Sequence, residues 1–372
     1  MEIIGIIAEY SPFHHGHAYH IKQIKALAPD SLIILVLNGY FLERGEVSIL
    51  NKEKKTKIAL ENNVDIVVEL PFVFGSNSAD TFAEAAVTLL NYLGVKKIVF
   101  GSESNDVKHL TKIANIQLSS PIDEKVKNFL DAGLNYPTAL NKAIGINTNT
   151  PNDLLGVSYI KAIIKNSFQI EPITIQRTSD YHDQASNDEI ISASNIRAKI
   201  KAGLSTTKYT NYSSEFNTVD EELLFNLLKY KIITTPELNT YLTVDEGIEH
   251  KLIKELNHCH SLEELIKKVK SKRYTYNRIQ RMLMHILIGL TKTDKNNLKI
   301  EYIKLLGFNR QGKTYLNKIK KELAIPLKRK ISNSYLAQQH ELKAAQIYDI
   351  ITGDNTSAYE LSNKPIEIDS LK

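Results

Sequence analysis

The 372-residue chain has almost no cysteine, and Cys259 is the single one. One thiol cannot form an internal disulfide, and the chain has no cysteine pair for a zinc knuckle or an iron–sulfur site. Such sparse use of thiols is typical of a reducing compartment, and we therefore expect a cytoplasmic protein.

Long apolar runs are also missing. No stretch approaches the roughly 18 apolar residues of a membrane span, and the first nine residues lack the basic segment and cleavage site of a signal peptide. We therefore expect no membrane partner and no secretion. With 42% hydrophobic and 24% charged residues, the composition predicts a globular protein, and the length allows two or three domains.

Positive charge is unevenly distributed along the chain. The net charge is +5, yet residues 251–330 hold 21 of the 47 Lys and Arg and only 6 of the 42 Asp and Glu. This segment has a local excess of +15, whereas the rest of the chain is acidic overall. A basic segment in an otherwise acidic chain predicts a polyanionic partner or, alternatively, a membrane surface.

Short apolar runs alternate with helical spacing in the first half of the chain. Five runs rich in Ile, Val and Leu are typical of buried parallel strands: residues 3–8, 32–37, 65–70, 97–100 and 171–176. Helical spacing lies between them, at residues 15–27, 52–62, 79–93 and 153–165. This alternation predicts an α/β fold with a doubly wound parallel sheet.

The second half is predicted to be helical. After a polar stretch at residues 205–219 we expect no further strand, and helical spacing recurs at residues 220–230, 244–257, 261–270, 276–290, 300–306 and 313–323. We therefore divide the chain into a first domain at residues 1–205 and a helical, basic domain at residues 206–372 with its basic core at 251–330. The polar tail beyond Asp354 is expected to be loosely ordered.

The segment after the first predicted strand contains His14, Gly16 and His17. It leads through Pro12 into the first turn of a helix, and ligands of doubly wound sheets bind at such carboxyl ends of strands. A helix start offers free N–H groups and a positive dipole to a phosphate, and Gly16 lets the backbone approach it. The two histidines face the same side and can donate to phosphate oxygens. We therefore predict a phosphate-binding site.

Two other interpretations of this segment remain open. The cluster could only cap the helix, or its four histidines could bind a divalent metal, these being His14, His15, His17 and His20. The first strand and turn supply only Glu9 as a carboxylate, so we predict no metal site built by the protein.

Residues 192–197, Ser-Ala-Ser-Asn-Ile-Arg, add a second piece that fits the same site. They are typical of a helix start, with Ser194 as the N-cap and Arg197 one turn later. The His-x-Gly-His spacing resembles the HIGH signature of nucleotidyltransferases and class I aminoacyl-tRNA synthetases, which bind ATP and stabilise attack on its α-phosphate. Residues 192–197 resemble the Ile-Ser-Ser-Thr-x-x-Arg motif that closes over the triphosphate in nucleotidyltransferases.

Together with other segments, these motifs resemble the bacterial tRNA(Met) cytidine acetate ligase family. The matching segments are residues 5–20, 43–46, 64–71, 100–104, 151–156, 175–177 and 181–183 and, more loosely, 305–327. The sequence departs from the family at Ser11 and His15, where the family usually has Asn, and at Glu43, where it usually has Gln.

The resemblance implies a nucleotidyltransferase-type fold and an ATP-dependent ligase. Acetate would be activated as acetyl-adenylate with release of pyrophosphate, and the acetyl group would pass to N4 of the wobble cytidine of elongator tRNA(Met). The implied substrates are ATP, with Mg²⁺ accompanying the triphosphate, acetate and the tRNA.

The resemblance also implies site residues. The expected catalytic residues are His14, His17 and Arg197. The expected ATP contacts are Ile7, Ala8, Glu9, Tyr10, Ser11, Pro12, Phe13, His14, His15, Gly16, His17, Ala18, Tyr19, His20, Gly101, Asn152, Arg177 and Ser194. From the residues alone, Asn152 could instead only cap a helix, and Arg177 could form a surface ion pair.

Two basic runs lie in the second half, the first just before Tyr274 and Tyr276. Lysines and arginines suit phosphates and tyrosines can stack on bases, so we expect these runs to contact tRNA. The expected contacts are Lys267, Lys268, Lys270, Lys272, Arg273, Lys318, Lys320 and Lys321. For any one run, a solvated helix face is the alternative.

Residues 307–314 match the P-loop pattern Gly-x4-Gly-Lys-Thr. A P-loop requires a buried strand before it and a helix after it. Because we predict a helix at residues 300–306, we interpret the match as a loop between helices and not as a nucleotide site.

Two other functions are compatible with the sequence. A small-molecule nucleotidyltransferase that adenylates a metabolite phosphate would share the nucleotide site but would not need the basic domain. A non-catalytic RNA-binding protein would not need the histidines. Nothing in the sequence indicates an obligate protein partner.

Overall fold

The structure is a computed structural model that describes residues 1–145, 150–177, 190–332, 334–362 and 364–369. Its strands are β1 Ile3–Ala8, β2 Leu32–Asn38, β3 Ile66–Leu70, β4 Lys97–Ser102, β5 Glu171–Gln176, β6 Ile303–Asn309, β7 Leu327–Lys328 and β8 Ile366–Ile368. Residues 181–183, which contribute to the family resemblance, lie outside the described residues.

Nine of the ten predicted helices are present within a few residues of their expected positions. In the first half the helices are α1 His15–Leu27, α2 Lys52–Glu61, α3 Phe72–Gly75, α4 Ala79–Tyr92, α5 Val107–Gln117, α6 Ser120–Asp131, α7 Tyr136–Ile144, α8 Pro151–Lys165 and α9 Ala193–Lys201. In the second half they are α10 Glu221–Thr234, α11 Ile248–Leu256, α12 Leu262–Val269, α13 Tyr276–Ile288, α14 Lys292–Asn297, α15 Arg310–Ile319, α16 Leu336–Thr352 and α17 Thr356–Leu361. Of these, α3, α5, α6, α7, α14, α16 and α17 were not predicted. Among the described residues, no helix is long and apolar enough to cross a membrane.

One sheet organises the molecule, with strand order β5-β4-β1-β2-β3-β6-β7 and β8 beside β6. The five strands predicted from the first half are all parallel neighbours, β1 pairing with β2 and β4, β2 with β3, and β4 with β5. The order β4-β1-β2 requires the chain to wind in both directions from β1. The predicted doubly wound α/β sheet is therefore confirmed.

Both faces of the parallel strands are buried, which explains their unbroken apolar sequence. On β2, Leu32, Ile34 and Val36 face the core that contains α4 and α8. The alternate residues Ile33 and Leu35 face a second core that contains α1 and α2. Each strand must therefore be apolar at every position, which is the pattern that the sequence shows.

The chain returns to the sheet near its end, which corrects the expectation that no strand follows residue 219. The helix predicted at residues 300–306 is wrong, because this segment contributes to β6, which pairs antiparallel with β3. The helical spacing of Glu301 and Lys304 favours a helix in the sequence. Lys304 is in fact buried, and the sheet tolerates it because it forms ion pairs with Glu69 and Glu360.

The P-loop-like residues do not form a loop between helices, contrary to the prediction. β6 ends at Asn309 and α15 begins at the next residue, so Gly307 lies in the strand and Gly312 in the first turn of the helix. A Cβ atom at Gly312 would collide with the carbonyl oxygen of Asp65. Lys313 forms an exposed ion pair with Glu367. Residues 307–314 thus leave no loop that could enclose a phosphate, and Gly312 serves close packing.

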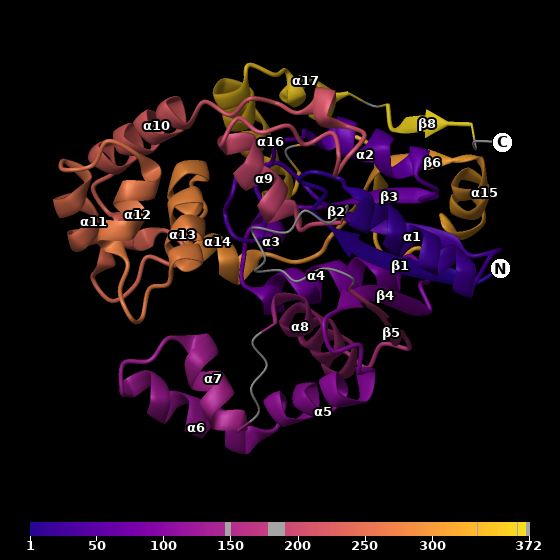
Figure 1. The fold of residues 1–372 in the computed structure, drawn as a ribbon, viewed down its shortest axis with the longest axis horizontal. Coiled ribbons are helices and arrows are strands. Elements are labelled where there is room, and N and C mark those ends of the chain that lie inside the picture. Colours follow the sequence, from indigo (N-terminus) through magenta and orange to yellow (C-terminus); the bar gives the residue numbers. More distant parts are fainter. Residues whose placement is uncertain (146–149, 178–189, 333, 363, 370–372) are drawn as a thin grey trace.

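The C-terminal tail is more ordered than expected. It contains α17 and β8, and Glu360 on α17 is fully buried. The helical part of the second half is α10–α14, which Figure 1 shows at one side of the molecule, with α6 and α7 below it. The division at residue 205 stays a prediction about folding units, but the sheet contains strands from both sides of that position.

Candidate nucleotide-binding site

The start of α1, directly after the β1 loop, brings two histidine rings together. The Nδ1 atom of His14 accepts a hydrogen bond from the Gly16 N–H at 3.0 Å, and the Nδ1 atom of His17 accepts one from the His14 N–H at 3.3 Å. The ring centroids of His14 and His17 are 3.9 Å apart. Because both Nδ1 atoms accept, the proton of each neutral ring lies on Nε2, where it can be donated to a ligand.

The first backbone N–H groups of α1 are already bonded, which corrects the expectation of free donors. The Gly16 N–H donates to the His14 ring, the His15 N–H to the Tyr209 carbonyl oxygen, and the His17 N–H to the His14 carbonyl oxygen. Gly16 makes room for this arrangement, because a Cβ atom there would lie 2.7 Å from the His14 ring. A phosphate at this helix start would meet imidazole Nε2–H groups and the helix dipole.

His14, His17 and His20 are neutral at pH 7. Burial lowers the pKa of His14 to about 3, and the positive charge of Arg177 acts in the same direction. Burial also lowers the pKa of His20 to about 4 and that of His17 well below its usual value. Desolvation penalises the charged form of a histidine. The positive charge of the site therefore comes from arginines.

Arg197 on α9 lies over the loop between β1 and α1. Its guanidinium donates to the Ser11 carbonyl oxygen at 2.6 Å and forms an ion pair with Glu46. The N-cap of α9 is Ser192, so the predicted cap at Ser194 is wrong by two residues. Ser194 lies in the first turn, where its hydroxyl is 3.3 Å from the Arg197 guanidinium. The start of α9 therefore lies close to the histidine segment, as predicted.

Gly101, Asn152 and Arg177 gather around Glu103, which follows β4. The Arg177 side chain crosses Gly101, where a Cβ atom would lie 3.3 Å from the Arg177 Cγ. Arg177 forms an ion pair with Glu103 at 3.7 Å, and the Asn152 amide donates to the same carboxylate at 2.5 Å. Asn152 lies inside α8, whose N-cap is Thr150, so the alternative of a cap at Asn152 is wrong.

The other expected ATP contacts lie on β1, on the turn after it and on α1. The buried rings of Tyr10 and Phe13 pack against His17, with centroid distances of 4.7 and 5.6 Å. Ile7 and Ala8 end β1, and Glu9, Ser11 and Pro12 lie in the turn that follows, whereas Ala18, Tyr19 and His20 lie on α1 with His15.

Sequence reasoning missed two buried polar residues, Asn38 and Lys55. The Asn38 amide donates to the Glu9 carboxylate at 2.7 Å and to the Gly75 carbonyl oxygen at 3.1 Å, so it joins the ends of β1 and β2 to α3. The Lys55 ammonium donates to the Gly39 carbonyl oxygen at 2.7 Å, and burial lowers the pKa of Lys55 to about 7. Asn38 could have been found as the polar residue after a predicted strand. A lysine on a helix carries no signal of burial.

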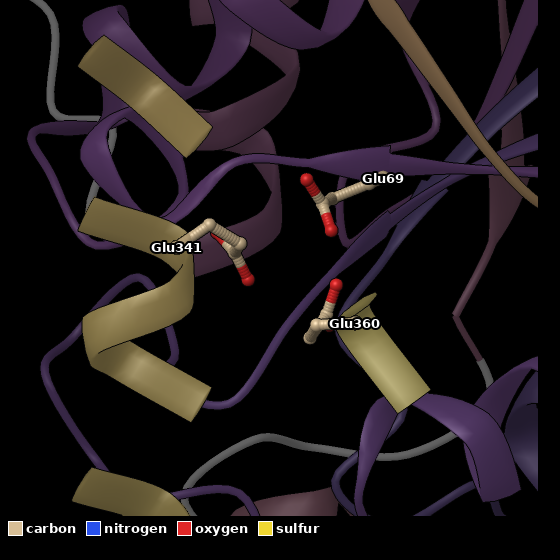
Figure 2. Close-up of side chains that lie close together, drawn as sticks. All are labelled: Glu69, Glu341 and Glu360. Carbon is tan, nitrogen blue, oxygen red and sulfur yellow. The ribbon is translucent and has the colours of Figure 1, made fainter. Parts of the chain in front are cut away.

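Three buried carboxylates lie close enough together to hold a metal ion: Glu69 on β3, Glu341 on α16 and Glu360 on α17 (Figure 2). The Lys52 ammonium already lies 2.5 Å from Glu69 and 2.6 Å from each of the other two. Lys304 adds a second positive charge. We call these five residues the buried ion-pair cluster. It fastens α16 and α17 to the sheet, and its centre is taken by an ammonium group.

The two basic runs do not form one surface. The first lies on and after α12 and the second on and after α15, at opposite sides of the molecule in Figure 1. Residues 251–299 contain twelve Lys and Arg and four Asp and Glu, whereas residues 300–330 contain nine and two. The basic core predicted at residues 251–330 is therefore split between two places.

Within the first run, the cations differ in their partners. Lys267 and Lys268 form ion pairs with glutamates one turn earlier on α12, at 2.6 and 2.8 Å, and Arg273 forms one with a glutamate at 2.9 Å. Lys270 and Lys272 are exposed, and neither has an ion pair in the described part of the chain. These two lysines are the most available for an anionic ligand.

Comparison with known proteins gives matches over nearly the whole chain. Residues 1–363 match the family model described as HIGH Nucleotidyl Transferase. The chain is 39% identical to a tRNA(Met) cytidine acetate ligase of Geobacillus sp., covering 90% of both chains. It is 34% identical to one of Bacillus subtilis, covering 94% of this chain and 92% of the relative.

Two solved structures of Thermotoga maritima TmcAL have the same fold. The apo form has a TM-score of 0.87 and the form bound with alpha-thio ATP a TM-score of 0.85. Each is 26% identical, and the match covers 99% of this chain and 100% of the other. The family resemblance, the α/β fold and the ligase class expected from the sequence are thereby confirmed. The chain belongs to the tRNA(Met) cytidine acetate ligase family of HIGH nucleotidyl transferases.

Proposed function

We propose that the chain is an ATP-dependent acetate ligase that acetylates N4 of the wobble cytidine of elongator tRNA(Met). The observation that carries the proposal is the pair of neutral histidines at the start of α1, His14 and His17, with Arg177 and Arg197 beside them. The name of the relatives, and the alpha-thio ATP bound to one structural neighbour, support this choice of substrates.

The first step proposed is adenylation of acetate. An acetate oxygen attacks the α-phosphorus of ATP, a P–O bond forms, and the bond to the pyrophosphate oxygen breaks. The Nε2–H groups of His14 and His17 donate to the α-phosphate oxygens, where negative charge develops. Arg177 and Arg197 would have to exchange part of their ion pairing with Glu103 and Glu46 for the triphosphate. Such a step needs positioning and electrostatic stabilisation and no covalent nucleophile.

The second step proposed is transfer to the RNA. The N4 amine of cytidine attacks the carbonyl carbon of acetyl-adenylate, a C–N bond forms, AMP leaves and the amine loses one proton. Because its substrates are a nucleotide and a tRNA, we propose the cytoplasm as the place of the reaction.

The side chains at this site do not fit a protein-bound Mg²⁺. That ion prefers oxygen ligands, whereas the groups at the start of α1 are imidazoles. The neighbouring carboxylates of Glu46 and Glu103 are ion-paired with arginines. We therefore propose that Mg²⁺ arrives with the triphosphate, and we assign it no protein ligand.

The test is ATP-dependent transfer of labelled acetate to tRNA(Met). We expect N4-acetylcytidine, AMP and pyrophosphate in equal amounts. His17→Ala should lower acetate-dependent exchange of pyrophosphate into ATP by about 10²–10³-fold, because a donor to the developing charge is lost. Binding of tRNA should be unchanged.

His250→Ala is the matched control, since the His250 side chain on α11 is 85% exposed. It should exchange pyrophosphate like the parent protein. Acetylation that uses acetyl-CoA and no ATP would refute the proposal. Adenylation of a small phosphate metabolite without any need for tRNA would favour a small-molecule nucleotidyltransferase instead.

A further inference from the structure

A groove of about 690 Å³ lies between Asn135 and the segment that joins α12 to α13. One wall begins at Asn135, the N-cap of α7, and the other carries Lys267, Lys270, Lys272 and Tyr276. None of the residues that line the groove is acidic. The groove therefore has the charge of a binding surface for a polyanion.

The two walls come from separate parts of the chain. Helices α6 and α7 have a small core of their own, formed by Ile122, Val126 and Ala139. Figure 1 shows them below α11–α13, away from the sheet. The Asn135 amide donates to the Lys272 carbonyl oxygen at 3.3 Å, and the Arg273 guanidinium donates to a carbonyl oxygen at the end of α6 at 3.1 Å. These two bonds join the α6–α7 pair to the segment after α12, and the lysine side chains of the groove are exposed.

Helix α13 leads from the groove toward the nucleotide-binding site. Tyr276 opens α13, and Arg281, five residues later on the same helix, forms an ion pair with Glu43 at 2.7 Å. Five helical residues span about 7.5 Å. Burial and then the charges of nearby glutamates, Glu46 among them, raise the pKa of Tyr276. Glu46 is the partner of Arg197 at the site. Helix α13 thus connects the groove to the loop that carries the Glu46 partner of Arg197.

We propose that this groove binds the sugar–phosphate backbone of the RNA substrate, with Lys270 and Lys272 contacting phosphates and Asn135, the N-cap of α7, on the opposite side. The inference rests on the proposed function and adds a location to it. The free cations and the lack of acidic lining residues favour a nucleic-acid backbone over an acidic protein, whose carboxylates are more widely and irregularly spaced.

The experiment measures tRNA(Met) binding as a function of salt for the Lys270→Ala/Lys272→Ala double variant. The plot of log K against log salt has a negative slope, and each lost phosphate contact makes it shallower by about 0.7–0.9. The double variant should therefore have a slope that is less negative by about 1.5. ATP binding should stay as in the parent protein. Lys57→Ala/Lys343→Ala removes the same charge from exposed positions on α2 and α16 and should leave the slope unchanged.

A second measurement places the RNA directly. A photo-crosslinking amino acid at Asn277, which lines the groove, should attach to tRNA(Met), and excess unlabelled tRNA should suppress the product. An unchanged slope in the double variant together with no crosslink would overturn the groove proposal while the parent protein still acetylates tRNA. Loss of acetylation by the parent protein itself would instead overturn the proposed function.

Discussion

At the scale of single residues, the spacing of the histidines could be read from the sequence but their chemical state could not. The two rings meet because His14 and His17 are three residues apart at a helix start. Their tautomers depend on backbone N–H groups that bond each Nδ1 atom, which only the structure gives. At Ser11, Arg197 binds the main-chain oxygen, so this contact does not depend on which side chain stands there.

His285 on α13 should make stability depend on pH. Burial lowers its pKa to about 4, against 6.5 in an unfolded chain. As pH falls from 6.5 to 4, only the unfolded state gains the proton. The contribution of neutral His285 to the free energy of unfolding is therefore complete above pH 6.5 and is lost as pH falls toward 4. At pH 5 the loss is about 2 kcal/mol. Between pH 7.5 and pH 5, the parent protein should lose about that much more unfolding free energy than His285→Gln, as measured by urea unfolding.

His250→Gln provides the control for this titration because the His250 side chain is exposed. Its stability should follow the same pH dependence as the parent protein. Identical pH dependence of the parent protein and His285→Gln would contradict the assignment.

At the scale of elements, the loop after β2 meets α13 at very close range. Gly45 has a φ of +80°, and a Cβ atom there would lie 2.7 Å from the Arg281 backbone nitrogen. The neighbouring Glu43 forms an ion pair with the Arg281 side chain. Burial raises the pKa of Glu43 while Arg281 opposes this shift. This junction joins the nucleotide-binding half to the helical part.

Gly45→Ala should therefore destabilise the protein more than Gly203→Ala. Both glycines have positive φ, which costs a non-glycine residue about 1 kcal/mol, but nothing lies within 4 Å of a Cβ atom at Gly203. We expect Gly45→Ala to lose about 1–3 kcal/mol beyond Gly203→Ala, because the backbone of α13 must move. Chemical unfolding of the two variants measures the difference. Equal losses would show that the loop and helix separate easily.

The same scale explains how much of the fold could be predicted. The parallel strands could be found because burial on both faces demands unbroken apolar runs. The strand β6 was not predicted because Lys304 interrupts its run of apolar residues. The carboxylates that neutralise this lysine, Glu69 and Glu360, are remote in sequence. Lys55 could not be predicted either, because a lysine on a helix gives no sign that backbone carbonyl oxygens will bind it in the interior. The groove could not be foreseen, because α7 and the α12–α13 segment meet only in the folded chain.

At the scale of the whole molecule, the buried ion-pair cluster holds distant segments together. Lys52 on α2 contacts carboxylates from β3, α16 and α17. A buried charge is costly unless it is paired. The cluster therefore stabilises the fold only when β3, α2, β6, α16 and α17 are all in place. The beginning and the end of the chain thus depend on each other for their folding.

Lys52→Met should destabilise the protein by about 3–5 kcal/mol, because three buried carboxylates would face Lys304 alone. The loss should be largest near pH 8 and smaller at acid pH, where a carboxylate can take up a proton. Lys57→Met, on the exposed side of the same helix, should change stability by less than about 0.5 kcal/mol. Thermal and urea unfolding measure both. Similar effects of the two variants would show that the cluster contributes little.

The antiparallel strand β6 also has a consequence during protein synthesis. β3 pairs with β2 on one side and with β6 on the other, and more than 200 residues separate β3 from β6 along the chain. At about 5–20 residues per second, a ribosome needs on the order of 10–50 s to make that interval. During that time the nascent sheet ends in the unpaired edge of β3, with the Glu69 carboxylate still lacking Lys304. This open edge is where a chaperone would be needed, and where premature contact between neighbouring nascent chains would begin.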